Sequence, residues 1–322
     1  MTYQEILANA RTCMGPYCKS CPVCNGVACK NTVPGPGAKG LGTGFIRNYQ
    51  KWQELCVNMD TICENVPVDT SYDFFGKRVA LPVFAAPVGA MQLHYGDKYD
   101  DLTYNDILVT ACAQAGIAAF TGDGTNPAVI EAAAEALKKN HGCGVPTVKP
   151  WNMELIREKL ALVKAADPIA VAMDIDAAGL PFLKNLTPPA GSKTVAELRE
   201  VAQAAGKPFI LKGIMTVSGA KKALEAGASG IAVSNHGGRG QVLQEGQAGG
   251  VDIHGDGDGI GRLHQRHLLA DQVDIPRLHR RHAAAVVLLQ RLGRRLDHGG
   301  IGTVAVKAAI PASAQAVTRM SL

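Results

Sequence analysis

Aromatic side chains are scarce in this chain of 322 residues, because phenylalanine, tyrosine and tryptophan together make up only 5% of it. Alanine, glycine and valine are abundant instead, and 47% of the residues are hydrophobic. This composition suits packed βα units better than a β-sandwich. The length is enough to bury one large core.

Long hydrophobic runs are also missing. No stretch of about 18 apolar residues occurs, so we expect no transmembrane helix and no membrane partner. The first residues, Met1 to Leu7, lack the basic segment followed by an apolar segment that marks a signal peptide. We therefore expect a cytoplasmic protein, in whose reducing surroundings the nine cysteines are not expected to form disulfides.

Basic residues are not in excess along the whole chain either. The net charge is +5, but much of the basic excess lies after residue 239. That late region has no aromatic residue on which a base could stack and no recognisable binding module. We expect no nucleic-acid partner.

The first 44 residues form a leader rich in cysteine and glycine. Five thiols fall within residues 13–29, and Cys18, Cys21, Cys24 and Cys29 could hold a zinc ion or an iron–sulfur cluster, because thiolates are soft ligands. A reduced surface loop that binds nothing is the other interpretation. The glycines between Pro34 and Gly44 match no phosphate-binding spacing and favour a flexible connector.

A periodic alternation of strands and helices follows in residues 45–242. Short apolar runs typical of strands buried on both faces alternate with amphipathic segments typical of helices. A first helix is expected in the leader at 2–12, and another at 45–63. The predicted strands are 81–86, 117–124, 144–149, 169–176, 208–212 and 231–234, and the predicted helices between them are 102–116, 128–139, 153–165, 195–205 and 218–227. This order predicts an α/β barrel whose polar groups gather at the carboxyl ends of its strands.

Reactive side chains stand at several of these strand ends. Lys212 ends the fifth predicted strand, and the run Ser234-Asn-His-Gly-Gly-Arg239 follows the sixth. Asp174 and Asp176 end the fourth. Because these positions share one face of a barrel, we expect Lys212, His236 and Arg239 to belong to one site.

With these residues in place, the chain resembles the FMN-dependent α-hydroxy-acid oxidase and dehydrogenase family, which includes lactate and glycolate oxidases. The Asn-His-Gly-Gly-Arg run carries most of the resemblance, which covers roughly residues 75–242. The resemblance implies a TIM (β/α)₈-type barrel, FMN as cofactor and a small 2-hydroxy acid as substrate. We also expect a homo-oligomer.

The resemblance implies a role for each matching residue. His236 would be the base that takes a proton from the substrate, and Asp176 the carboxylate that orients it. Lys212 would stabilise negative charge on the reduced flavin, and Arg239 would bind the substrate carboxylate. The backbone of Ala86, Pro87 and Val88 would pack against the flavin ring.

The chain departs from the family pattern in four respects, of which the cysteine-rich leader suggests a divergent branch. The cysteine-rich leader has no counterpart in the common pattern. Lys149 stands where the family has a tyrosine that contacts the substrate, and Asp174 stands where it usually has threonine. The phosphate-binding glycine motifs of strands seven and eight do not appear after residue 242.

The segment 243–322 differs in character from everything before it. No aromatic residue follows Phe209, Lys307 is the only lysine after Arg239, and six of the nine histidines lie there. We interpret the residues from about Gly240 onward as translated in a shifted reading frame. Strands one to six of the barrel are therefore recognisable, and strands seven and eight are not.

Two other functions remain open at this point. A type 2 isopentenyl-diphosphate isomerase, a related FMN barrel, would need several basic groups for a diphosphate, and only Lys149 and Lys212 are obvious. A non-catalytic product without an FMN phosphate site is the alternative of another class.

Overall fold

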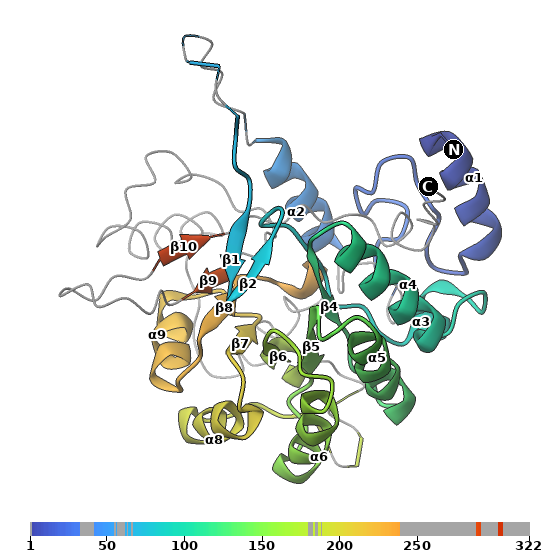
Figure 1. The fold of residues 1–322 in the computed structure, drawn as a ribbon. Coiled ribbons are helices and arrows are strands. Elements are labelled where there is room, and N and C mark those ends of the chain that lie inside the picture. Colours follow the sequence, from blue (N-terminus) through green and yellow to red (C-terminus); the bar gives the residue numbers. More distant parts are fainter. Residues whose placement is uncertain are drawn as a thin grey trace, which may run out of the picture.

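Six parallel strands form the sheet around which the molecule is arranged (Figure 1). The computed structural model describes residues 2–32, 42–54, 56, 62, 64–65, 67–179, 183, 186–187 and 189–238, together with the backbone of 288–290 and 302–304. The six strands are β3 (Phe84–Ala85), β4 (Ala118–Thr121), β5 (Gly144–Val148), β6 (Val171–Asp174), β7 (Phe209–Lys212) and β8 (Gly230–Ala232). Each pairs in parallel with the next one in the chain.

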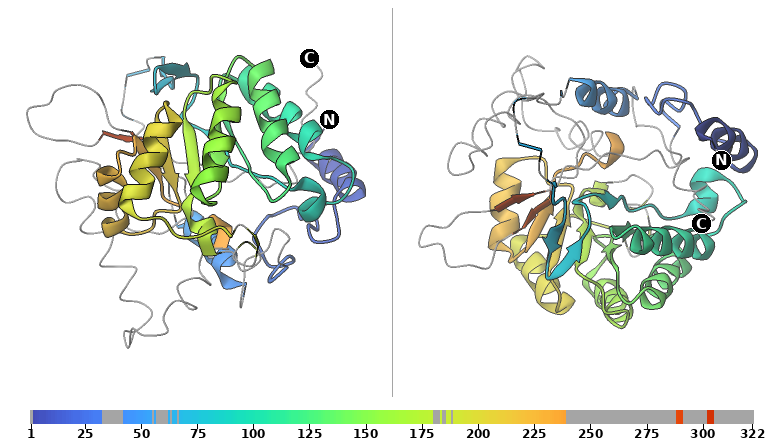
Figure 2. Two further views of the ribbon diagram at one scale, coloured as in Figure 1. Left: turned by 90° about the horizontal axis from the view of Figure 1, so that it is seen from below. Right: turned by 45° about the horizontal axis from the view of Figure 1, so that its top comes forward.

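The connecting helices cover the outer face of this curled sheet (Figures 1 and 2). They are α4 (Asp101–Gln114), α5 (Pro127–Lys139), α6 (Met153–Lys164), α8 (Val195–Ala205) and α9 (Val217–Glu225). The residue before each helix is aspartate, asparagine or threonine, and its side chain accepts a backbone N–H of the first turn. The barrel-type α/β fold predicted from the sequence is confirmed over these six strands.

Side chains of each strand alternate between two apolar layers. Ala118, Phe120, Val145, Ala172 and Ile210 point to the inside of the curled sheet and pack together. Their neighbours on the same strands, such as Val171, Met173, Phe209 and Leu211, pack outward in a cluster with residues of the helices. This alternation means that Thr147, Asp174 and Lys212, each two positions after an inward residue, also face inward.

A short hairpin closes the amino end of the sheet. It consists of β1 (Tyr72–Phe74) and β2 (Lys77–Val79), which pair antiparallel. Phe74 is fully buried and its ring lies 4.5 Å from that of Phe84, which in turn lies 6.1 Å from Phe120. Burying such a side chain contributes roughly 1.5–3 kcal/mol. The sequence pattern predicts neither this hairpin nor the short helix α3 (Met91–Tyr95).

Two helices precede the barrel. α1 (Tyr3–Cys13) begins with a capping box between Thr2 and Glu5, close to the predicted start. α2 (Thr43–Gln53) covers the first part of the helix expected at 45–63, and most of the remaining positions lie outside the described residues. α2 packs against η2 (His236–Gly238), a single turn that follows β8.

The parallel series ends at β8 in the part of the chain that the structure describes. The next strand in the sheet, β9 (Leu288–Gln290), is antiparallel to β8, and β10 (Gly302–Val304) is antiparallel to β9. A (β/α)₈ barrel would continue with two further parallel strands. The described part of segment 243–322 therefore supplies a hairpin at the edge of the sheet, not the seventh and eighth barrel strands.

No helix within the described residues is both long enough and apolar enough to cross a bilayer.

Candidate functional site

The carboxyl ends of β6, β7 and β8 bring Asp174, Lys212 and His236 together. In the sheet register Asp174 lies beside Lys212, and Lys212 beside Ala232, four residues before His236. The sequence pattern predicts a strand that continues to Asp176, but β6 ends at Asp174 and a 3₁₀ turn, η1 (Ile175–Gly179), follows. Asp174 and Lys212 are the last residues of the pairing between β6 and β7.

Asp174 contacts the other charged side chains of the site. Its Oδ1 lies 2.5 Å from the Lys212 ammonium, and its Oδ2 lies 3.5 Å from the ammonium of Lys149, just after β5. Burial raises the pKa of the Asp174 carboxyl, but His236, Lys212 and Lys149 outweigh burial and hold that pKa well below its usual value. Asp174 is therefore an anion that compensates the two lysines in a largely buried place.

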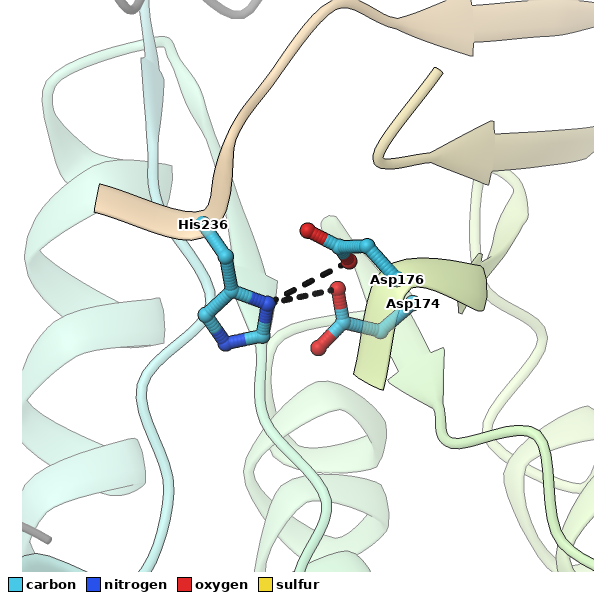
Figure 3. Close-up of side chains that lie close together, drawn as sticks. All are labelled: Asp174, Asp176 and His236. Carbon is cyan, nitrogen blue, oxygen red and sulfur yellow. Dashed lines mark hydrogen bonds and ion pairs between the residues drawn. The ribbon is translucent and has the colours of Figure 1, made fainter. Parts of the chain in front are cut away.

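The imidazole of His236 is held by two carboxylates through one nitrogen. Its Nδ1 lies 3.2 Å from Asp176 Oδ1 and 3.4 Å from Asp174 Oδ1. Figure 3 shows this nitrogen turned toward both aspartates and the other ring nitrogen, Nε2, turned away from them. The Lys212 ammonium, at 3.5 Å, is also near Nδ1, but it has a much closer acceptor in Asp174. Nδ1 therefore donates a hydrogen bond to Asp176, and Nε2 is the ring nitrogen that faces away from the carboxylates.

The backbone at His236 is unusual and fixes the direction of the ring. His236, Gly237 and Gly238 have φ values of 58°, 65° and 84°, in the left-handed region that glycine tolerates and histidine adopts only occasionally. The His236 N–H donates to Ser234 Oγ at 3.1 Å, and the Gly238 N–H donates to Asn235 Oδ1 at 3.1 Å. A non-glycine residue with positive φ, such as His236, keeps this strained conformation only where surrounding contacts determine it.

Helix α2 supplies one of those contacts. Asn48 on α2 and Asn235 exchange two side-chain hydrogen bonds, each 2.9 Å long. Both amides thereby satisfy a donor and an acceptor with the same partner. This reciprocal pair connects the N-terminal part of the chain to the residue next to His236.

Asp176 lies against backbone that only glycine allows. Gly213 follows β7 with φ of 97°, and a Cβ at that position would lie 2.5 Å from Asp176 Cγ. Such a distance is well inside van der Waals contact. Gly213 therefore lets Asp176 occupy the place from which it reaches His236.

A small, mostly apolar cavity opens beside the charged cluster. Phe84, Ala85, Ala86, Pro87, Phe120, Lys212 and Ala232 line it. Of the residues expected to contact a flavin, Ala86, Pro87 and Lys212 border this cavity. Val88 does not, and its backbone instead passes close to Gly122, where a Cβ would lie 2.5 Å from the Val88 carbonyl. A larger cavity lies at the amino ends of the strands, away from His236.

A buried aspartate that the sequence pattern does not indicate, Asp123, supports the site through the backbone of Lys149. Asp123 accepts hydrogen bonds from Lys159 at 2.7 Å, from Trp151 Nε1 at 2.8 Å and from the backbone N–H groups of Gly124 and Lys149 at 2.8 and 3.0 Å. These four donors satisfy both carboxylate oxygens. The Lys149 contact fixes the backbone from which the Lys149 ammonium reaches Asp174.

Two further predictions concern Arg239 and the cysteines of the leader. Arg239 falls just outside the described residues. The four cysteines proposed as ligands lie in the segment between α1 and α2, are all partly buried, and do not belong to the group of ligand-type side chains around His236. In the described part of the chain, Asp174, Asp176 and His236 are the only ligand-type side chains grouped within 4.8 Å of one another, and Lys212 already supplies a cation there.

Comparison with known proteins identifies the family. The model of the FMN-dependent dehydrogenases matches residues 36–185 and 182–242. The chain belongs to this family. Among curated relatives, 4-hydroxymandelate oxidase of Amycolatopsis orientalis is 26% identical over 271 residues, covering 71% of this chain and 72% of that protein. Pre-mycofactocin synthase of Mycobacterium tuberculosis is 52% identical over 52 residues, which are 16% of this chain and 12% of that protein.

Solved structures of FMN-dependent α-hydroxy-acid oxidases share the fold. A mandelate oxidase matches with a TM-score of 0.56 and 20% identity, covering 74% of this chain and 70% of that one. A lactate oxidase of Pediococcus acidilactici matches with a TM-score of 0.55 and 18% identity, covering 73% of this chain and 66% of that one. The chain thus spans slightly less than two thirds of this lactate oxidase.

Proposed function

We propose that the chain oxidises a small 2-hydroxy acid to the 2-oxo acid, with His236 as the base and FMN as the hydride acceptor. The arrangement of His236 is the observation that carries the proposal. Its Nδ1 is engaged by Asp176, its Nε2 is available, and Lys212 stands beside it on the border of an apolar cavity. An imidazole held in this way presents Nε2 as the ring nitrogen that can accept a proton.

Ala86, Pro87 and Lys212 are the described residues that would contact a flavin ring. Ala86 and Pro87 give the cavity an apolar wall, and Lys212 places a cation at its edge. FMN, when bound, would accept the hydride equivalent released from the α-carbon of the substrate. Lys212 would stabilise the negative charge that reduction brings to the ring. The glycine motifs that hold the FMN phosphate in the family do not appear after residue 242, so the contacts described here are those to the ring.

His236 would take the proton of the substrate hydroxyl at Nε2. The imidazolium formed in this way would keep its Nδ1 proton and donate it in a hydrogen bond to Asp176, whose carboxylate would stabilise the positive charge. Asp174, 3.4 Å from the same nitrogen, would add to this stabilisation. Arg239 would bind the substrate carboxylate in the bidentate geometry that guanidinium groups favour.

The substrate is a 2-hydroxy acid in this proposal because the chain belongs to a family whose members named here act on such compounds. The relatives named above include oxidases of 4-hydroxymandelate, mandelate and lactate. A cytoplasmic location and a homo-oligomer stay predictions.

The diphosphate-isomerase alternative is less well supported. It would need free cations for two phosphates, but Lys212 and Lys149 both lie beside Asp174, at 2.5 and 3.5 Å. Their charge is therefore already partly compensated. The match to the family of FMN-dependent dehydrogenases also favours oxidation.

Reconstitution with FMN tests the proposal against the non-catalytic alternative. The purified chain should retain FMN after gel filtration, and anaerobic addition of lactate, glycolate or mandelate should bleach the flavin absorbance. A chain that retains no FMN would contradict both enzyme functions. A chain that retains FMN but is bleached by none of these acids, while dithionite does bleach it, would contradict the proposed substrate class.

A further inference from the structure

Lys149 is a largely buried cation to which the proposed oxidation assigns no role. It follows β5 directly, and the alternation along that strand turns its side chain to the inside of the sheet. Its side chain is only 14% exposed, and it does not line the cavity proposed for the flavin ring. A lysine that loses most of its contact with water normally has a partner that offsets the loss.

The main chain at Lys149 is fixed on both sides. Its N–H donates to Asp123 Oδ2 at 3.0 Å, and its carbonyl accepts the N–H of Trp151 at 2.9 Å. The indole Nε1 of Trp151 donates to the same Asp123 oxygen at 2.8 Å. The point from which the Lys149 side chain starts is therefore well defined, as is expected of a residue that binds a ligand.

The ammonium of Lys149, in contrast, is poorly satisfied. Within the described residues it has one ion pair, with Asp174 Oδ2 at 3.5 Å, and no hydrogen bond. Charge-assisted hydrogen bonds are usually about 2.7–2.9 Å long. The buried lysines Lys212 and Lys159 each have a carboxylate contact at least this short, at 2.5 and 2.7 Å. Lys149 therefore keeps N–H donors for a further acceptor.

Lys149 and His236 lie on either side of Asp174. Asp174 Oδ1 is 3.4 Å from His236 Nδ1, and its Oδ2 is 3.5 Å from the Lys149 ammonium. The strands β5, β6, β7 and β8 follow one another in the sheet, so the two residues come from opposite ends of this group of strands (Figure 1). Their side chains, 17% and 14% exposed, are also more accessible than those of Asp174, Asp176 and Lys212. A molecule that reaches His236 from the solvent can thus contact Lys149 as well.

We propose that Lys149 binds a second carboxylate of the substrate, which makes the preferred substrate a 2-hydroxy dicarboxylic acid. This inference rests on the proposed oxidation of a 2-hydroxy acid. Arg239, which follows β8, is expected to bind the carboxylate next to the reacting carbon, so the cation at β5 is left for the far end of the molecule. A carboxylate there would accept the unused N–H donors of Lys149, whereas an apolar end would leave them without a partner. Monocarboxylic 2-hydroxy acids would still be oxidised, but with a lower kcat/KM.

A matched pair of 2-oxo acids tests the proposal by binding alone. The acids 2-oxoglutarate and 2-oxopentanoate have the same chain length, and a carboxylate replaces a methyl group at the far end of the first. Isothermal titration calorimetry on the full chain, as purified and after loading with FMN, should show at least about 10-fold tighter binding of 2-oxoglutarate, the usual effect of a hydrogen bond to a charged group. Lys149→Met should remove this preference by weakening the binding of 2-oxoglutarate alone.

Two further variants control for charge and for the fold. Lys149→Arg keeps the cation and should keep the preference. Lys193→Met removes a lysine from a loop that contacts Pro150, the residue after Lys149. The Lys193 ammonium already donates to the carbonyls of Pro150 and Gly191, at 3.2 Å each, so this variant should also keep the preference.

Three results would overturn the role of Lys149. Equal affinity for the two acids in the unsubstituted chain is the first, and it does not depend on how any variant folds. The second is an equal loss of affinity for both acids in Lys149→Met, because Lys149 would then act on the end that the acids share. The third is a preference that survives in Lys149→Met.

Flavin reduction by 2-hydroxyglutarate and 2-hydroxypentanoate separates this inference from the proposed function. Reduction by both acids with equal kcat/KM would support the oxidation and contradict the role of Lys149. A binding preference that depends on Lys149, in a chain whose flavin neither acid reduces, would support the role of Lys149 and contradict the oxidation.

Discussion

The carboxylate of Asp174 compensates the positive charges of the two lysines of the site. Its carboxylate contacts Lys212 and Lys149, and these contacts lie in a largely buried place. Removing one partner of such a buried group leaves the others without compensation, which commonly costs about 3–5 kcal/mol. The effect of Asp174 on stability should therefore depend on pH.

Asp174→Asn is expected to lower the free energy of unfolding by about 3 kcal/mol at pH 7. The pKa of Asp174 is depressed in the folded chain, so its contribution is present above the usual value of 3.8 and is lost as the pH falls through the folded pKa. The difference between the variant and the unsubstituted chain should consequently shrink below about pH 4. Unfolding midpoints measured at several pH values check this.

Asp106→Asn is the control for this experiment. Asp106 pairs with Lys139 at the surface, where ion pairs contribute little. An equal loss of stability in both variants at pH 7 would contradict the claim that Asp174 compensates the buried charges of Lys212 and Lys149.

Gly213 is expected to be necessary for the position of Asp176. Gly213→Ala introduces a Cβ that overlaps Asp176, whereas Gly227→Ala introduces one into open space, although both glycines have positive φ. Both variants should lose roughly 1–2 kcal/mol of stability from the backbone conformation. Only Gly213→Ala should also slow the reduction of bound flavin by substrate, and equal rates in the two variants would refute the positional argument.

Some of the site residues can be predicted from the sequence and others cannot. Lys212 and His236 were predictable because each follows a recognisable buried strand, and parallel strands end at a common face. Asp123 was not, because its donor Lys159 is 36 residues away and nothing local distinguishes its carboxylate from a surface one. Asn48 pairs with a residue 187 positions later, a separation that no local pattern reports.

At the level of secondary structure, α2 acts on the site through the turn η2. The Asn48–Asn235 pair holds the residue next to His236, and Asn235 in turn accepts the Gly238 N–H. The buried strands were predicted correctly because continuous apolar runs between turns are distinctive. The hairpin β1–β2 was not, because strands of three residues are too short to show a period.

Asn48→Ala is expected to loosen this turn. The Asn235 amide would lose its partner in a partly buried place, at a cost of about 1–3 kcal/mol. Hydrogen exchange in the peptide that contains residues 235–238 should become faster, and flavin reduction should slow while FMN stays bound. Gln50→Ala, at an exposed position of the same helix, should change neither. Unchanged exchange in Asn48→Ala would show that the amide pair does not hold the turn.

At the scale of the whole molecule, β8 is the last parallel strand among the residues that the structure describes. The strand that extends the sheet is antiparallel, and the composition changes at the same point of the sequence. The hypothesis of a shifted reading frame predicts that another frame of the gene, read past codon 239, encodes two further βα units with aromatic residues. A gene in which neither alternative frame has that pattern would refute the hypothesis.

The central claim is that His236 takes the substrate proton beside the flavin. The most direct measurement is the single-turnover rate of flavin reduction, followed by absorbance under anaerobic conditions in the FMN-loaded chain. His236→Ala should retain FMN and reduce it at least about 100-fold more slowly, the usual contribution of a general base. His141→Ala, at the opposite end of the strands, should react at the unsubstituted rate. Reduction of the flavin in His236→Ala at the full rate would contradict the account.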